Sequence, residues 1–298
     1  MASPNDKAFT MEPVMIDRRT LALGLPLLAA AAPDRFAPLR RAIAQIERSA
    51  GGPIGVALID THSGHRFTHR AADRFPLCST FKLLLAARLL HGADQGEWAM
   101  AERLPIRRED MLNNAPFSEK RIGGSASLLE LAEAMCVLSD NPAANIGLAR
   151  IGGPAVLTFW LRAIGDQTTR LDRTEPEMNN ETPGDPRDTS TPAAVLATAR
   201  ALVAGRILSP AARAQLFAWM QASRTADTMI RAALPPGWQE ANKTGAGSWR
   251  ARNIISVITP PGRRPIWVTA YLFAAKSELA ERNRHFPPLG RAIVESLA

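Results

Sequence analysis

A serine and a lysine stand three positions apart in the segment Cys78-Ser79-Thr80-Phe81-Lys82, which leads into the apolar run LLLAARLL. The run predicts a buried helix that begins near the serine, and a spacing of three places Ser79 and Lys82 on one face of it. A desolvated lysine can give up its proton and activate a serine hydroxyl, and the N-terminus of the helix supplies N–H groups where an oxyanion would form. The alternative is a serine helix cap beside a solvent-facing lysine.

Lysine is rare in this chain, which makes its positions informative. Only five of the 36 basic residues are lysine, and the other 31 are arginine, which cannot give up its proton. A second lysine of interest opens Lys243-Thr244-Gly245, just before two strand patterns. Glycine there allows a ligand to approach the backbone, the threonine hydroxyl can bind a carboxylate, and the lysine adds positive charge. A turn before a strand is the alternative interpretation.

The third motif is Ser139-Asp140-Asn141, which follows the helical pattern LLELAEAMCVL. A hydroxyl at this place can relay a proton to a leaving nitrogen, and the amide of Asn141 can hold the acyl side chain of a substrate. Ordinary helix-end and turn chemistry explains the same three residues when they are considered alone.

The three motifs occur in the order S-x-x-K, S-D-N and K-T-G, and this combination is typical of class A β-lactamases and penicillin-binding proteins. The chain resembles a class A serine β-lactamase. The stretches RFPLCSTFK, LSDNPAANIGLARIGGP and TRLDRTEPEMNN support the resemblance, which covers essentially all of the mature chain. It implies hydrolysis of the β-lactam amide of penicillin- or cephalosporin-type antibiotics through a serine acyl-enzyme, and thus antibiotic resistance.

A polar segment at residues 173–188 looks like the omega loop of that family, with its E-x-x-x-N signature. By this resemblance Glu175 is the general base that activates a water molecule, and Asn179 is the amide that fixes the water. The resemblance also implies a cis peptide bond before Pro176 and a salt bridge from Arg173 to Asp188. A D,D-peptidase or penicillin-binding protein needs the first three motifs but nothing like this pair, so that class is the main alternative.

The resemblance implies a role for each remaining motif residue. Ser79 would attack the lactam carbonyl, and its proton would pass to Lys82 or, through a water molecule, to Glu175. Backbone N–H groups of Ser79 and Ala246 would bind the oxyanion, and Ser139 would protonate the ring nitrogen. The catalytic set is Ser79, Lys82, Ser139 and Glu175, and the substrate-binding set is Asn141, Asn179, Lys243, Thr244, Gly245, Ala246 and Arg252. No cofactor and no metal is expected.

Several positions depart from the family pattern. Asn114 replaces an aromatic residue at the edge of the cleft, and Thr174 stands where many members carry tryptophan, which predicts weaker binding of bulky penicillin side chains. Cys78 resembles the carbapenemase subgroup, but Gly247 occupies the position of its usual disulfide partner. We therefore expect Cys78 and Cys136 to be free thiols, and their spacing does not suit a zinc site.

The elements that must position these residues follow from periodicity. Residues 33–49 predict an amphipathic helix, IGVALID and residues 66–69 a hairpin, residues 79–222 mainly helices, and IISVITP and IWVTAYLF two strands before a last helix around 289–297. These patterns predict an α/β fold of the α+β type, in which 33–71 and 223–298 form one domain and 72–222 an inserted all-helical domain. The resemblance specifies an antiparallel five-stranded sheet flanked by helices.

The first 32 residues read as a signal peptide. Arg18 and Arg19 precede an apolar stretch at residues 21–32 that ends in small residues, and Met15 is a possible true start. The arginine pair suggests export to the periplasm by the twin-arginine route. The stretch is shorter than the roughly 20 residues of a membrane span, so no stable membrane insertion is expected, and a membrane-tied penicillin sensor that does not hydrolyse its ligand is disfavoured.

The chain of 298 residues carries a formal net charge of +8 and a sequence pI of about 10.4. Its arginines are dispersed, without a long basic run or interleaved aromatic residues, so they indicate a solvated basic surface and not a nucleic-acid site. The expected partner is a small-molecule β-lactam, and the expected state is a monomer.

Overall fold

The computed structural model describes residues 34–275 and 278–297. The signal peptide expected at residues 1–32 lies outside the described residues. Residues Arg35–Ala298 group into one compact unit by their contacts.

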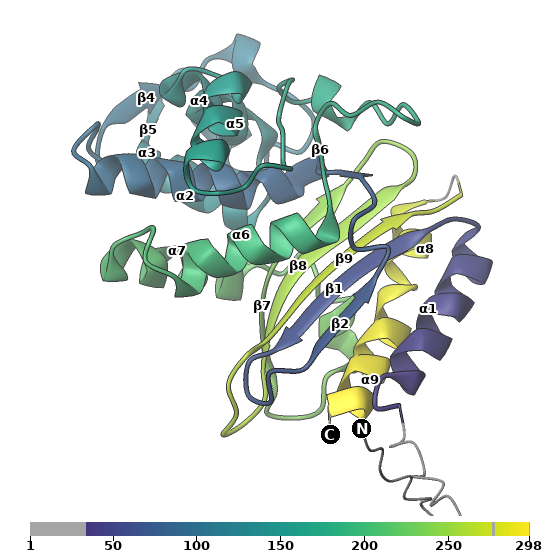
Figure 1. Ribbon diagram of the computed structural model, residues 1–298. Coiled ribbons are helices and arrows are strands. Elements are labelled where there is room, and N and C mark those ends of the chain that lie inside the picture. Colours follow the sequence, from purple (N-terminus) through teal and green to yellow (C-terminus); the bar gives the residue numbers. More distant parts are fainter. Residues whose placement is uncertain (1–33, 276–277, 298) are drawn as a thin grey trace, which may run out of the picture. The chain divides into compact units, whose positions relative to one another are not determined.

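An antiparallel sheet of five strands forms the centre of this unit, in the order β2-β1-β9-β8-β7 (Figure 1). Its strands are β1 (Ile54–Asp60), β2 (Arg66–His69), β7 (Gln239–Ala246), β8 (Ala251–Thr259) and β9 (Ile266–Phe273). Strand β1 pairs with β9, so the two ends of the chain meet in one sheet. The expected mixed fold with a five-stranded antiparallel sheet is confirmed.

Helices α1 (Ala37–Ala50) and α9 (Phe286–Leu297) lie side by side against one face of the sheet (Figure 1). Helix α1 begins at Ala37, later than expected, because Pro38 is tolerated only in the first turn of a helix. It ends at Gly51, whose φ of 66° suits a left-handed cap. Apolar side chains of both helices and of strands β1, β8 and β9 fill the core between these layers. The short helix α8 (Leu279–Asn283) precedes α9.

Helices dominate the chain between β2 and β7. They are α2 (Phe81–Asp94), α3 (Leu128–Val137), α4 (Asn141–Ile151), α5 (Pro154–Ala163), α6 (Pro192–Ala204) and α7 (Pro210–Ala222). Two small antiparallel pairs join β3 (Phe75–Pro76) to β6 (Thr189–Ser190) and β4 (Arg103–Pro105) to β5 (Ser125–Ser127). Helix α2 is buried on all sides, as its apolar run predicts, and packs in one core with the other face of the sheet.

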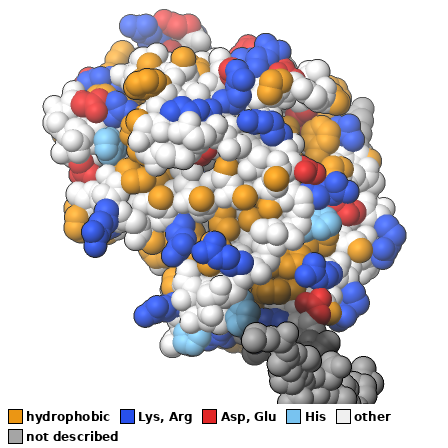
Figure 2. Space-filling view, in the orientation of Figure 1, with side chains coloured by type: hydrophobic (Ala, Val, Ile, Leu, Met, Phe, Trp, Pro, Cys, Tyr) orange, Lys and Arg blue, Asp and Glu red, His pale blue; other side chains and the backbone are white. Residues whose placement is uncertain are grey.

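Charged side chains are dispersed over the face seen in Figure 2, where blue lysines and arginines alternate with red carboxylates and apolar groups. Among the described residues, no helix is long and apolar enough to cross a membrane.

Candidate active site

Ser79 lies in a 3-10 turn, Cys78–Thr80, that runs directly into α2. Cys78 adopts a positive φ of 45° there. Two hydrogen bonds to the Leu77 carbonyl stabilise the turn. The Thr80 hydroxyl donates to it at 2.6 Å and the Asn253 amide at 3.2 Å. The serine is therefore presented at the start of a buried helix by a constrained backbone, as its sequence context predicts.

Lys82 is fully buried one turn further along α2. Its Nζ donates to the Ser139 carbonyl at 2.9 Å and to Asn141 Oδ1, and lies 3.1 Å from Glu175 Oε1. Burial lowers the pKa of Lys82, although the charge of Glu175 opposes that shift. The lysine thus connects three of the predicted motifs, which are distant in sequence.

Glu175 occupies the omega loop with its carboxylate buried against Lys82. Asn179 Nδ2 donates to Glu175 Oε2, as the E-x-x-x-N spacing suggested. Asn145 of α4 binds both backbone polar groups of Glu175. Its amide donates to the Glu175 carbonyl at 2.8 Å, and its Oδ1 accepts from the Glu175 N–H at 3.0 Å. The sequence analysis missed Asn145, whose only signal was its place in the stretch LSDNPAANIGLARIGGP.

Two expectations about the omega loop are confirmed. The Glu175-Pro176 peptide bond is cis. Arg173 Nε lies 2.5 Å from Asp188 Oδ2, and Asp188 also accepts from the backbone N–H of Asp172 and of Arg173. The buried carboxylate of Asp188 therefore connects the two ends of the loop.

Ser139 precedes α4 and has a positive φ of 59°. Its hydroxyl accepts a hydrogen bond from Lys243 Nζ at 3.1 Å. Asn141 donates to the Asn113 carbonyl at 2.9 Å while its oxygen faces Lys82. The middle residue, Asp140, faces away from this group and caps α4 by accepting from Ala143 N–H at 2.9 Å.

Strand β7 brings Lys243, Thr244, Gly245 and Ala246 to the same place. Lys243 is buried, and burial, followed by the charge of Lys82, lowers the pKa of Lys243 to about 7. A Cβ on Gly245 would lie only 3.0 Å from the Leu77 carbonyl oxygen and 3.1 Å from the Thr80 nitrogen. The missing side chain allows β7 to pack directly against the turn that carries Ser79.

Arg252 projects from β8 opposite Ala246. Its guanidinium donates to the Gly245 carbonyl at 3.2 Å, to the Thr225 carbonyl at 3.1 Å and to Asn283 Oδ1 at 2.6 Å. Burial and the nearby charge of Arg282 lower the pKa of Arg252 to about 10. Sequence reasoning did not identify Thr225 or Asn283, which lie on segments without a motif.

These groups surround a cavity of about 470 Å³. Its lining includes Ser79, Ser139, Asn141, Asn179, Thr244, Ala246 and Arg252, together with Asn113, Asn114, Leu138, Thr225, Gly247, Ser248, Leu279 and Asn283. Lys82 and Glu175 are buried beneath this lining and contact it through Asn141 and Asn179. The structure therefore gathers two serine hydroxyls, two buried amines and a buried carboxylate around one cavity.

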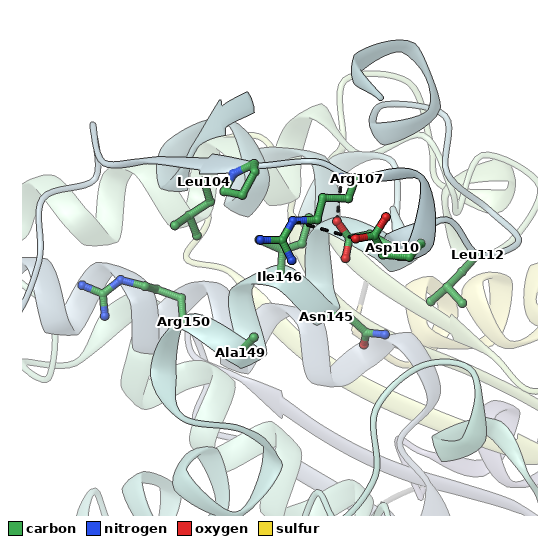
Figure 3. A pocket seen from close by; sticks show the side chains of 10 residues that line it. Leu104, Arg107, Asp110, Leu112, Asn145, Ile146, Ala149 and Arg150 are labelled. Carbon is green, nitrogen blue, oxygen red and sulfur yellow. Dashed lines mark hydrogen bonds and ion pairs between the residues drawn. The ribbon is translucent and has the colours of Figure 1, made fainter. Parts of the chain in front are cut away.

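Another cavity, of about 380 Å³, is lined on one side by Asn145, Ala149 and Arg150 of α4 (Figure 3). Its charged side chains have partners: the Arg107 guanidinium lies 3.9 Å from Glu109, Asp110 accepts a hydrogen bond from the backbone N–H of Arg107 at 2.7 Å, and Arg150 binds Glu102 at 2.9 Å. Within the described ranges, no three His, Cys, Asp or Glu side chains converge as a metal site would require. The cavity beside Ser79 is the candidate active site because residues of all the predicted motifs line it.

The two cysteines are free thiols, as expected, and both are buried. Burial raises the pKa of the Cys78 thiol and raises the pKa of Cys136 to about 12, so both thiols are protonated at neutral pH.

Comparisons with known proteins agree with this geometry. A model described as "Beta-lactamase enzyme family" matches residues 38–297. Beta-lactamase CTX-M-8 of Citrobacter amalonaticus is 41% identical over 265 residues, which cover 89% of each chain. An ancestral class A β-lactamase structure is 48% identical with a TM-score of 0.83, covering 86% of this chain and 99% of that one. A β-lactamase structure from Xanthomonas campestris pv. campestris is 45% identical with a TM-score of 0.87, covering 90% and 100%.

Proposed function

Since the chain belongs to the β-lactamase enzyme family and is a class A serine β-lactamase, we propose that Ser79 opens the lactam ring and that Glu175 directs water onto the resulting acyl-enzyme. The enzyme hydrolyses β-lactam antibiotics and thereby confers resistance. The observation that carries the assignment of residues is the buried Glu175 carboxylate, which lies 3.1 Å from Lys82 Nζ beside the cavity that exposes Ser79.

Acylation uses the groups around the serine. Ser79 Oγ forms a bond to the lactam carbonyl carbon, and its proton passes to Lys82 or, through a water molecule, to Glu175. The lowered pKa of Lys82 favours the neutral amine that the first route needs. Backbone N–H groups of Ser79 and Ala246 stabilise the oxyanion. As the C–N bond breaks, Ser139 Oγ gives its proton to the ring nitrogen, and Lys243, 3.1 Å away, restores it.

Substrate binding uses the positive groups of β7 and β8. Lys243, Thr244 and Arg252 hold the substrate carboxylate, and Asn141 contacts the acyl side chain. Gly245 keeps β7 close to the Ser79 turn, since a Cβ there would crowd that turn.

Deacylation distinguishes a hydrolase from a D,D-peptidase or a sensor that stops at the acyl-enzyme. Glu175 removes a proton from water, whose oxygen attacks the ester carbonyl and releases Ser79. The buried Asn179 Oδ1 has no hydrogen-bond partner within the described ranges, so it is available to orient that water. Neither rival class requires this carboxylate and amide.

The test is hydrolysis of a chromogenic cephalosporin by the mature protein, followed by intact mass. Ser79→Ala should abolish turnover without unfolding the protein. Glu175→Ala should slow deacylation by at least about a thousandfold, so that one equivalent of covalent adduct accumulates. Glu177→Ala, which removes an exposed acid from the same loop, should retain turnover. Unchanged turnover in Glu175→Ala would rule out its role as the base.

We also propose that residues 1–32 direct export to the periplasm by the twin-arginine route and that the mature enzyme acts as a monomer. The arginine pair and the apolar stretch support export. The boundaries 33–71 with 223–298, and 72–222, remain our proposal for its two domains. Light scattering during size-exclusion chromatography measures the oligomeric state, and a dimer mass would contradict the monomer.

A further inference from the structure

Glu181 joins the omega loop to the turn between β7 and β8. It lies two residues after Asn179, and its carboxylate accepts hydrogen bonds from the backbone N–H of Arg250 at 2.8 Å and of Ala251 at 3.0 Å. A carboxylate that accepts two backbone N–H groups makes a strong and directional contact. The loop that carries the proposed base is therefore attached to a segment about 70 residues away in the sequence.

The contact depends on Gly247. A Cβ at this position would lie 1.4 Å from Glu181 Oε1 and 2.5 Å from its carboxyl carbon. The carboxylate thus fills the space that any side chain at 247 would need, so the pair Glu181 and Gly247 is mutually dependent. Gly247 also donates to the Ala251 carbonyl at 3.1 Å, which closes the turn.

The guanidinium group of Arg282 binds the carbonyl groups of the same turn. Arg282 of α8 is buried and donates to the carbonyl of Gly247 at 3.0 Å and to that of Ala251 at 2.8 Å. Glu181 binds the N–H groups of the turn and Arg282 binds its carbonyl groups. Glu181 therefore attaches the turn to the omega-loop segment, and Arg282 attaches the same turn to α8.

The turn and the omega loop both line the cavity. Gly247 and Ser248 contribute from the turn, next to Ala246 at the end of β7, and Asn179 contributes from the loop. We propose that Glu181 is a specificity-determining positioning residue, which fixes the spacing of these two walls and so limits the size of the β-lactam acyl substituent that fits between them. The proposal rests on the proposed roles of Ser79 and Glu175.

The first test compares kcat and KM for benzylpenicillin and for ceftazidime, whose acyl group is bulky and branched. Glu181→Ala should lower the KM for ceftazidime relative to that for benzylpenicillin by about tenfold, the scale on which pocket size discriminates substrates. Glu181→Gln should give a smaller shift, since an amide retains one acceptor. The control Glu177→Ala should change the KM ratio by less than about twofold. A ratio in Glu181→Ala equal to that of Glu177→Ala would overturn the proposal.

The second test uses the dependence between the two positions. Gly247→Ala should displace the carboxylate and shift the KM ratio in the same direction, whereas the combined variant should match Glu181→Ala alone. A combined variant whose shift in the KM ratio equals the product of the two single shifts would contradict a contact between Glu181 and Gly247. Should Gly247→Ala fail to fold, amide exchange at Arg250 and Ala251 decides instead: it should be faster in Glu181→Ala than in Glu177→Ala, and equal rates would overturn the proposal.

Failure of this proposal is distinguishable from failure of the residue assignment. An unchanged KM ratio with turnover that Ser79→Ala abolishes leaves the catalytic assignment intact and removes only the role of Glu181. Turnover that survives Ser79→Ala removes the assignment itself.

Discussion

At the scale of single residues, the two buried lysines of the site have different charged neighbours, and these neighbours act in opposite directions on the two pKa values. Lys82 lies 3.1 Å from the Glu175 carboxylate, which opposes the lowering of its pKa by burial. Burial, and then the charge of Lys82, lowers the pKa of Lys243 to about 7, and its amine faces the Ser139 hydroxyl at 3.1 Å. Arginine retains its proton in either place, which explains why a chain so rich in arginine uses lysine at both.

The titration of Lys243 predicts a pH dependence of substrate binding. Below pH 7 the amine is charged and attracts the substrate carboxylate. As the pH rises through about 7 the charge is lost, so kcat/KM in the free enzyme should fall, mainly through a higher KM. Lys243→Arg keeps its charge and should remove this alkaline decline, although it should also lower kcat because arginine cannot return a proton to Ser139. The measurement is kcat/KM between about pH 5.5 and 9, and a flat wild-type profile would contradict the role of the charge.

At the scale of elements, two residues of the S-D-N motif line the cavity and the third stabilises the fold around them. Ser139 and Asn141 face the cavity, whereas Asp140 is fully buried behind them. Its carboxylate accepts from the N–H groups of Phe117, Ser118 and Ala143 and from the Ser118 hydroxyl, all between 2.7 and 3.0 Å. Asp140 therefore ties the start of α4 to the preceding loop and holds the motif in position.

Asp140→Asn should destabilise the fold by about 2 to 4 kcal/mol, because an amide nitrogen cannot accept the hydrogen bonds that one carboxylate oxygen receives. Ser209→Ala removes an ordinary cap of α7 and should cost only about 1 kcal/mol. Urea unfolding of both variants measures the difference. A loss in Asp140→Asn no greater than that in Ser209→Ala would show that the network around Asp140 contributes little.

At the scale of the whole molecule, the active site lies where segments from the entire described chain meet. Strand β7 reaches the cavity from the C-terminal part of the sheet, α2 and α4 from the helical part, and the omega loop from between α5 and α6. The site therefore requires all of these segments in their folded positions. An export route that carries folded proteins suits an enzyme of this kind.

The proposed route predicts the fate of a twin-lysine variant. Replacing Arg18 and Arg19 with lysine should leave the enzyme in the cytoplasm with residues 1–32 still attached, whereas the wild type should appear in the periplasm without them. The same exchange at the pair Arg107 and Arg108 should not affect export. Fractionation followed by intact mass provides the measurement, and normal export of the Arg18→Lys, Arg19→Lys variant would exclude the twin-arginine route.

The sequence alone determined the features that depend on local spacing and side-chain type. An unbroken apolar run predicted the buried α2, and short apolar patterns predicted the strands of both chain ends. The order of three motifs, with Glu175 and Asn179, predicted the family. The bounds of α1 and α9 were less predictable, because prolines in the first turns of these helices are compatible with several starting points.

Only the tertiary structure decided the contacts between distant segments. Three such contacts leave no periodic signal in the sequence. They are the hydrogen bonds of Asn145 to Glu175, the hydrogen bond of Asn253 to the Ser79 turn, and the packing of Glu181 against Gly247. Each depends on where whole helices and strands come to rest against one another. Periodicity reports which face of an element is buried, whereas the packing of all elements together determines which side chain it meets.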